Sequence, residues 1–185
     1  MLVLLGKTAS GKDSLKKELI KLGYQSVVTT TTRPMRDGEI NGVSYHFIDD
    51  DTFLEMEVTG QLAESTYYET AFGRWYYGSQ LKDLKELSNE KKVVILNPDG
   101  IYSLMTKIDM SNWMICYIDC SEETIRKRLE QRGDDSEEAE RRLEADKKDF
   151  VNIKRVCDHV FTNENNTDIE SLARIIDFMY GRNSK

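Results

Sequence analysis

The fold follows from the stretch Gly6-Lys7-Thr8-Ala9-Ser10-Gly11-Lys12-Asp13, which lies between an apolar run and an amphipathic one. The run Leu2–Leu5 is typical of a buried strand. After the stretch, the spacing of Leu15 and Leu19 puts apolar side chains on one face of a helix. A Gly-x4-Gly-Lys-Ser/Thr loop between a strand and a helix is the context in which phosphate is held. The sequence therefore predicts a phosphate-binding loop at residues 6–13.

The chemistry of this loop suits an anion. Glycines let the backbone curl so that its N–H groups point toward a bound anion. The N-terminus of the following helix adds partial positive charge. Lys12 supplies an ammonium group to the β- and γ-phosphates. Asp13 stands where the pattern has a Ser or Thr that binds Mg²⁺, and Ser14 follows it. A carboxylate is also a hard oxygen ligand, directly or through water. The alternative is a glycine-bounded turn without a ligand. We expect nucleotide contacts from Gly6, Thr8, Ala9, Ser10, Gly11, Lys12, Asp13 and Ser14.

Charge narrows the classes of partner. The 185 residues carry 26 Lys and Arg against 33 Asp and Glu, a net charge of −7. Both a nucleic-acid coat protein and a membrane-surface helix need a basic surplus, so the composition argues against them. Residues 1–36 nevertheless hold seven basic and two acidic side chains. The positive charge therefore gathers where the anion-binding elements are expected.

The cysteines indicate a reducing compartment. Cys116, Cys120 and Cys157 cannot all pair and form no Cys-x-x-Cys motif, so a cytoplasmic protein with small buried thiols is favoured over a metal site. The apolar start at residues 1–5 is too short to target a membrane or to span one.

Strand and helix patterns alternate along one continuous domain without linkers. Extended or apolar runs predict strands at 27–32, 93–96, 114–118 and 160–162. Charged amphipathic runs predict helices at 122–132 and 137–154, and Thr167 to Glu170 reads as a capping box that opens the last helix. Such alternation indicates an α/β fold with a mostly parallel sheet. Residues 33–79 interrupt it with a small, mostly β segment.

A second anion site is expected after residue 32. Arg33 and Arg36 lie beside a run of threonines, and guanidinium groups bind phosphate through two parallel hydrogen bonds. For the two arginines alone, a solvated turn is the better explanation.

The residues around this site resemble a known family. Thr31-Thr32-Arg33, Arg36-Asp37-Gly38-Glu39, Asn41-Gly42 and Tyr45-His46-Phe47 are similar to the nucleoside-monophosphate signature of guanylate kinases. Further matches are Glu64, Tyr76-Tyr77-Gly78-Ser79, the arginines 128, 132 and 142, and Asn163. The resemblance covers essentially the whole chain.

The resemblance implies the P-loop nucleoside monophosphate kinase fold in a single domain. Residues 1–32 and 80–185 would form the core, with a helical lid at about 126–145, and residues 33–79 would bind the monophosphate. The implied reaction is transfer of the γ-phosphoryl group of MgATP to GMP or dGMP. Mg²⁺ would accompany ATP, and the protein would be a monomer or a homodimer with no nucleic-acid or membrane partner.

The resemblance also implies roles for particular residues. Phosphoryl transfer would depend on Lys12, Arg33, Arg128, Arg132 and Arg142. ATP would also contact Arg128 and Asn163. GMP would be held by Thr29, Arg33, Arg36, Glu39, Tyr45, Glu64, Tyr77, Gly78, Ser79 and Asp99. Within this set Thr29 and Glu64 would read guanine, because a carboxylate accepts from both N1–H and the 2-amino group.

The sequence also departs from the family pattern, for example at Pro34-Met35, where the family's usual proline is shifted by one position. Asn97 stands where the family has an aspartate, so we hypothesise that the carboxylate near the metal has moved to Asp13 in the loop. About four extra residues lie around Tyr67. Two alternatives stay open: a kinase of the same fold for another monophosphate, and a non-catalytic binding module.

Overall fold

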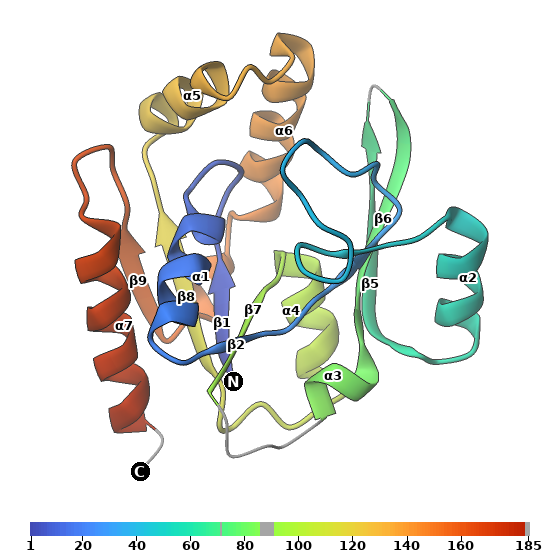
Figure 1. Ribbon diagram of the computed structural model, residues 1–185, viewed down its shortest axis with the longest axis horizontal. Coiled ribbons are helices and arrows are strands. Elements are labelled where there is room, and N and C mark those ends of the chain that lie inside the picture. Colours follow the sequence, from blue (N-terminus) through green and yellow to red (C-terminus); the bar gives the residue numbers. More distant parts are fainter. Residues whose placement is uncertain (71, 86–90, 184–185) are drawn as a thin grey trace. The chain divides into compact units, whose positions relative to one another are not determined.

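The computed structural model describes residues 1–70, 72–85 and 91–183 (Figure 1). The chain forms two compact units, which are described separately. The first contains Met1–Ser26, Lys91–Pro98 and Met110–Lys185, and the second contains Val27–Glu90 and Asp99–Asp109. Among the described residues, no helix is both long and apolar enough to cross a membrane.

The first unit is built on a five-stranded sheet of order β2-β7-β1-β8-β9, in which every neighbouring pair is parallel. Its strands are β1 (Leu2–Leu5), β2 (Gln25–Ser26), β7 (Lys92–Ile95), β8 (Met114–Asp119) and β9 (His159–Thr162). All four side chains of the central strand β1 are fully buried. An unbroken apolar run is what a strand covered on both faces requires. The predicted parallel α/β fold is confirmed.

Two long helices pack together in this unit. They are α1 (Lys12–Lys21) and α7 (Ile169–Asn183). Leu15 and Leu19 of α1 share one apolar cluster with Ala173 and Ile176 of α7 and with side chains of β1. This packing fixes the N-terminal end of α1, and with it the loop that joins β1 to α1.

Two charged helices follow β8. They are α5 (Glu122–Gln131) and α6 (Ser136–Asp149). Ser121 and Asp135 cap them, each accepting a backbone N–H from the first turn. Arg126 of α5 donates to Glu140 of α6 at 2.6 Å, so an exposed ion pair joins the two helices.

The predicted helix 137–154 is wrong at its C-terminal end. The helix α6 stops at Asp149, and a 3-10 turn, η1, follows at Ile153–Arg155. Because the helix ends there, the Phe150 ring packs near Tyr117 of β8, with ring centroids 5.8 Å apart. The Ile153 side chain in the following turn is fully buried. The charge pattern carried no sign of these two long-range contacts.

The predicted capping box at Thr167 is also wrong. The helix α7 begins at Ile169, and the Asp168 carboxylate accepts the Glu170 N–H at 3.1 Å. The Thr167 hydroxyl is already used in the preceding turn, where it accepts the Glu164 N–H at 2.9 Å.

The second unit is built on a four-stranded mixed sheet of order β4-β3-β6-β5. Its strands are β3 (Thr30–Thr31), β4 (His46–Phe47), β5 (Leu62–Thr70) and β6 (Gly73–Gln80), and its helices are α2 (Asp50–Val58), α3 (Leu81–Lys85) and α4 (Pro98–Met105). The mostly β segment predicted between residues 33 and 79 is present. The helix α2 within it was not predicted.

Strand register places the side chains of this unit. A bulge between Leu62 and Glu64 sets Glu64 opposite Ser79 in the β5–β6 hairpin. Gly78 pairs with Thr30 on the other side of β6. The hairpin continues past Tyr67, which pairs with Tyr76, to a last pair that joins Thr70 to Gly73.

Candidate functional site

The β1–α1 loop has no room for side chains at two of its glycines. A Cβ on Gly6 would stand 2.5 Å from the Ser10 hydroxyl oxygen and 2.7 Å from the Ile118 carbonyl oxygen. Gly11 has φ +92°, and a Cβ there would stand 2.2 Å from Nδ2 of Asn163. The glycines at both ends of the motif are therefore required by the shape of the loop.

Lys12 folds back over the loop. Its Nζ donates to the carbonyl oxygens of Gly6 and Lys7, both at 2.7 Å. Burial lowers the pKa of Lys12, while the nearby carboxylates of Asp13 and Asp146 act in the opposite direction. The ammonium group is thus held within the loop, where the sequence places a phosphate contact.

Arg128 and Asn163 reach the same loop from distant parts of the chain. Arg128 donates to the carbonyl oxygens of Ala9 at 3.2 Å and of Asn163 at 3.1 Å. Asn163, only 4% exposed, donates from Nδ2 to the Ser10 carbonyl oxygen at 2.8 Å. Both side chains therefore stabilise the loop, because each donates a hydrogen bond to one of its carbonyl groups.

Asp146 contacts the phosphate loop, and the sequence analysis did not predict this contact. Its Oδ2 accepts the backbone N–H of Thr8 at 2.7 Å. Burial raises the pKa of Asp146, and the Thr8 N–H and the Lys12 ammonium oppose that rise. An aspartate in a charged helix, 138 positions from Thr8, gives no local signal of such a contact.

The other two candidate lid arginines are held in ion pairs. Arg142 donates to Glu138 at 2.9 Å and to Asp134 at 3.2 Å, and Arg132 pairs with the same Asp134. Burial alone would raise the pKa of Glu138, but hydrogen bonds from Arg141 and Arg142 bring it below its usual range. The acidic residues of this segment therefore position the arginines.

Asp13 and Ser14 lie exposed in the first turn of α1. Among residues 1–70, 72–85 and 91–183, no three His, Cys, Asp or Glu side chains form a group that could hold a metal ion. Mg²⁺ in phosphate-transfer sites is usually held by one or two protein oxygens, several waters and the substrate phosphates. An exposed carboxylate with a neighbouring hydroxyl fits an ion that arrives with a triphosphate.

The second unit contains a buried arginine that is held by a carboxylate. Arg33, 4% exposed, donates from Nη2 to both Glu39 oxygens, at 2.7 and 3.0 Å. Glu39 also accepts the backbone N–H of Arg36 at 2.8 Å. Burial opposes ionisation of Glu39, but the bonds from Arg33 and Arg36 hold its pKa below the usual range. Glu39 thus fixes the Arg33 guanidinium.

Aromatic rings surround this arginine. The Arg33 guanidinium carbon lies 5.5 Å from the ring centre of Tyr45 and 5.6 Å from that of Phe47. The rings of Tyr45 and Tyr77 meet edge to face with centroids 6.3 Å apart. The structure therefore brings together a fixed cation and two phenols, a set of donors suited to a phosphate dianion.

A buried carboxyl group lies on the same sheet. Glu64 is 4% exposed, and burial raises its pKa, while Ser79 and Lys107 counteract the rise. The Lys107 ammonium donates to the Ala63 carbonyl oxygen at 2.9 Å, next to Glu64 in the chain. The Ser79 hydroxyl is fully buried and makes no well-formed hydrogen bond within the described part of the chain. The Glu64 carboxyl group and the Ser79 hydroxyl are therefore buried neighbours on paired strands.

The remaining candidate residues occupy supporting positions. A Cβ on Gly78 would stand 2.9 Å from the Glu64 carbonyl oxygen, so a glycine permits the close β5–β6 pairing. The Thr29 carbonyl oxygen accepts the His46 N–H at 2.8 Å. Asp99 is exposed in the first turn of α4.

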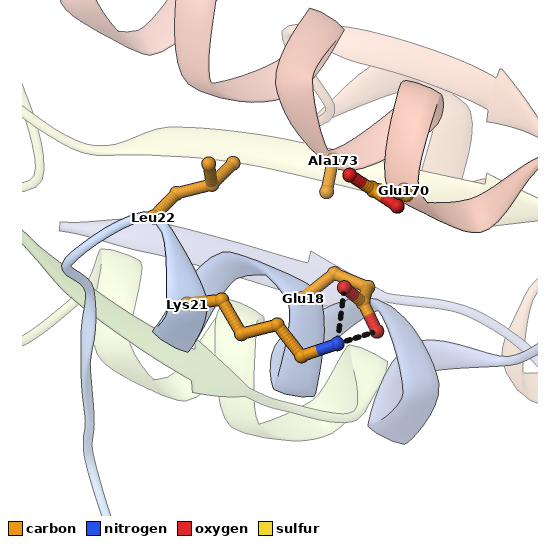
Figure 2. A pocket seen from close by; sticks show the side chains of 5 residues that line it. All are labelled: Glu18, Lys21, Leu22, Glu170 and Ala173. Atoms are coloured by element: carbon orange, nitrogen blue, oxygen red, sulfur yellow. Dashed lines mark hydrogen bonds and ion pairs between the residues drawn. The ribbon is translucent and has the colours of Figure 1, made fainter.

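A small surface pocket of about 120 Å³ lies elsewhere, between α1 and α7 (Figure 2). Glu18, Lys21, Leu22, Glu170 and Ala173 line it, and Lys21 pairs with Glu18 at 2.8 Å. Its α1 side lies at the C-terminal end of that helix, and at 1.5 Å per residue Lys21 lies about 13 Å along the helix from Lys12. Two carboxylates in the lining also make it unsuited to phosphate.

A parallel α/β unit with a phosphate loop, together with a separate unit that presents a buried arginine and two phenols, defines a nucleotide-binding phosphotransferase of the P-loop class. The sequence model of the family described as guanylate kinase matches residues 1–178. The chain belongs to the guanylate kinase family.

Relatives and solved structures agree with this assignment. The chain is 32% identical to the guanylate kinase of Sulfurimonas denitrificans, over 95% of this chain and 85% of that protein. It is 30% identical to the guanylate kinase of Leifsonia xyli subsp. xyli, over 98% and 71% of the two chains. The crystal structure of guanylate kinase from Anaplasma phagocytophilum has the same fold, with a TM-score of 0.70 at 22% identity, over 100% of this chain and 85% of that one.

Proposed function

We propose that this protein transfers the γ-phosphoryl group of MgATP to GMP or dGMP, which gives ADP and GDP or dGDP. The observation that carries the proposal is the register of the second sheet. Ser79 pairs across the hairpin with Glu64, and Tyr77 lies two residues before Ser79. Side chains two apart in a strand share a face. Glu64 and Ser79, the candidate base-reading pair, therefore lie on the same side of the sheet as Tyr77 of the candidate phosphate cluster.

Glu64 gives guanine an advantage over other bases. When ionised, its carboxylate accepts the N1–H and 2-amino groups of guanine, and the buried Ser79 hydroxyl supplies a further polar partner. Adenine lacks that pair of donors and would leave a buried carboxylate unpaired. Sites built to hydrogen-bond a substrate reject analogues that lack the matching groups.

Transfer needs no general base, because the acceptor phosphate is already an anionic nucleophile. Its oxygen forms a bond to the γ-phosphorus as the bond from that phosphorus to the ADP oxygen breaks. Arg33, fixed by Glu39, holds the acceptor phosphate. Lys12, Arg128, Arg132 and Arg142 neutralise charge on the transferred group, so catalysis is positioning plus electrostatic stabilisation.

Mg²⁺ would be held by the ATP phosphates together with Asp13 and Ser14, through water or directly. When bound, it supplies charge neutralisation at the β- and γ-phosphate oxygens. Asp13 is the only residue of the phosphate-loop motif 6–13 that brings a carboxylate to this position.

The decisive experiment is a coupled ADP-release assay with GMP, dGMP, AMP, CMP and UMP as acceptors. Highest turnover with GMP or dGMP supports the proposal. Preference for another monophosphate would reassign the acceptor, and calorimetry that detects neither ATP nor GMP binding would favour a non-catalytic binding module.

We also propose a reducing, cytoplasmic setting. All three cysteines are free thiols, and Cys116 and Cys120 are buried. The substrates would be small nucleotides, bound by a monomer or a homodimer that sedimentation would distinguish.

A further inference from the structure

The phosphate loop already holds an anion from its own chain. Backbone N–H groups of such loops are the donors that bind phosphate oxygens. In this structure the Thr8 N–H is donated to Oδ2 of Asp146 at 2.7 Å, which is the length of a charge-assisted bond. The carboxylate belongs to α6 and is half-buried. An anion of the protein therefore occupies a donor of the loop.

The charges around Asp146 are those that a phosphate would meet. Lys12 from α1 and Lys7 from the loop attract the carboxylate, while Asp149 from its own helix repels it. Tyr117 of β8 also lies within electrostatic reach. These groups make the position an anion site whether the anion is a carboxylate or a phosphate.

The two anions exclude each other. One N–H has one hydrogen, and a good hydrogen bond to Asp146 leaves none for a phosphate oxygen. A triphosphate placed beside the same lysines would also be repelled by the carboxylate. The contacts that brace this loop differ in kind: Arg128 and Asn163 donate to the carbonyl groups of Ala9 and Ser10, whereas the Asp146 carboxylate accepts an N–H group.

We propose that Asp146 is a built-in competitor of the donor nucleotide, which occupies the Thr8 N–H and sets the affinity of the loop for nucleoside triphosphates. This inference rests on the proposed function insofar as ATP binds at the loop. Binding of ATP then requires the Asp146 carboxylate to leave Thr8. Because α6 also carries Arg142 four residues earlier, the competing carboxylate and an arginine proposed for catalysis lie on one helix face.

The test is calorimetric titration of MgATP, and separately of inorganic tripolyphosphate, into four proteins: wild type, Asp146→Asn, Asp146→Ala and Glu144→Gln. Glu144 lies on the same helix, exposed and paired with Lys147, so its variant removes the same charge without touching the loop. Removing a charge-assisted competitor should tighten binding of both ligands about tenfold in the two Asp146 variants. The Glu144 variant should match the wild type.

A purely structural role for Asp146 gives the opposite result. If the carboxylate only holds the loop in shape, both Asp146 variants bind MgATP more weakly, and unchanged or weaker binding in proteins that still bind GMP overturns the proposal. GMP titration reports on the second unit and serves as the folding check for each variant. If neither MgATP nor GMP binds to any of the four proteins, the proposed function fails as well, which separates the two outcomes.

Discussion

Asn163 Nδ2 lies 2.8 Å from the Ser10 carbonyl oxygen and 2.2 Å from the position that a Cβ on Gly11 would take. One buried amide therefore both braces the phosphate loop and sets the space available at its last glycine. The C-terminal end of β9, just before Asn163, thus controls the shape of a loop 153 positions earlier in the chain.

Gly11→Ala should destabilise the protein and weaken ATP binding at least tenfold, since the new Cβ displaces Asn163. Gly23→Ala is the matched control, because Gly23 has φ +91° but nothing within 4 Å of its added Cβ. The control should lose about 1–2 kcal/mol, the backbone strain alone, and should bind ATP normally. Equal losses of stability in the two variants, measured by urea denaturation, would show that the contact with Asn163 is unimportant.

Asp13→Ala should lower Mg²⁺-dependent turnover about tenfold to a hundredfold and should raise the Mg²⁺ concentration needed for half-maximal rate. The reason is loss of the one loop carboxylate that can approach the ion. Steady-state assays over a Mg²⁺ series measure both effects. Glu18→Gln, which removes a charge from the same helix, should leave both quantities unchanged, and full activity of Asp13→Ala would refute the role.

Arg33→Lys should raise the KM for GMP about tenfold to a hundredfold and leave the affinity for ATP unchanged. A lysine cannot keep the planar two-bond contact with Glu39 or the position above Tyr45. Arg74→Lys offers a comparison, since Arg74 pairs with Glu69 on the exposed hairpin of the same unit. If both variants have the wild-type KM, the buried guanidinium does not bind the acceptor.

Affinity for GMP should fall as pH is lowered from neutrality through the pKa of Glu64, which burial has raised. A protonated carboxyl loses an acceptor that guanine needs. Calorimetry across a pH series measures the effect. In Glu64→Gln the affinity should be about tenfold to a hundredfold lower and should lose this component of its pH dependence.

The same group gives a stability prediction of defined sign. Between the ordinary pKa of a glutamate and the raised value in the folded state, the folded protein binds more protons than the unfolded one. The free energy of unfolding must therefore decrease as pH rises through that window. Denaturation of wild type and Glu64→Gln should show this slope in the wild type only.

Local pattern was enough to predict the core of the fold. The strands around Leu2–Leu5 and Met114–Asp119 were predictable because parallel strands covered on both faces are continuously apolar. The helix α2 was not, because Phe53 is its only buried side chain and one apolar contact leaves no helical period. Its carboxylate cap at Asp49, which accepts the Thr52 N–H at 2.7 Å, was the available signal.

Local motifs were enough to nominate candidate site residues, but contacts between distant parts of the chain could not be predicted from them. The glycines of the loop and the Arg33–Glu39 pair lie within short stretches. Of the candidate lid arginines, Arg142 pairs with Glu138, whereas Arg128 turns to the loop. Only the tertiary fold shows which carboxylate meets Thr8.

The exposed ion pairs that join α5 to α6 make this hairpin sensitive to dissolved salt. At 0.1 M ionic strength the screening length is about 10 Å, and it shortens further as salt is added. Screening weakens the Arg126–Glu140 pair and the pairs around Asp134 but leaves the apolar burial of β1 untouched. The ion pairs that hold the segment with the three candidate catalytic arginines should therefore weaken as salt is added. The packing of the sheet that carries the phosphate loop should not change with salt.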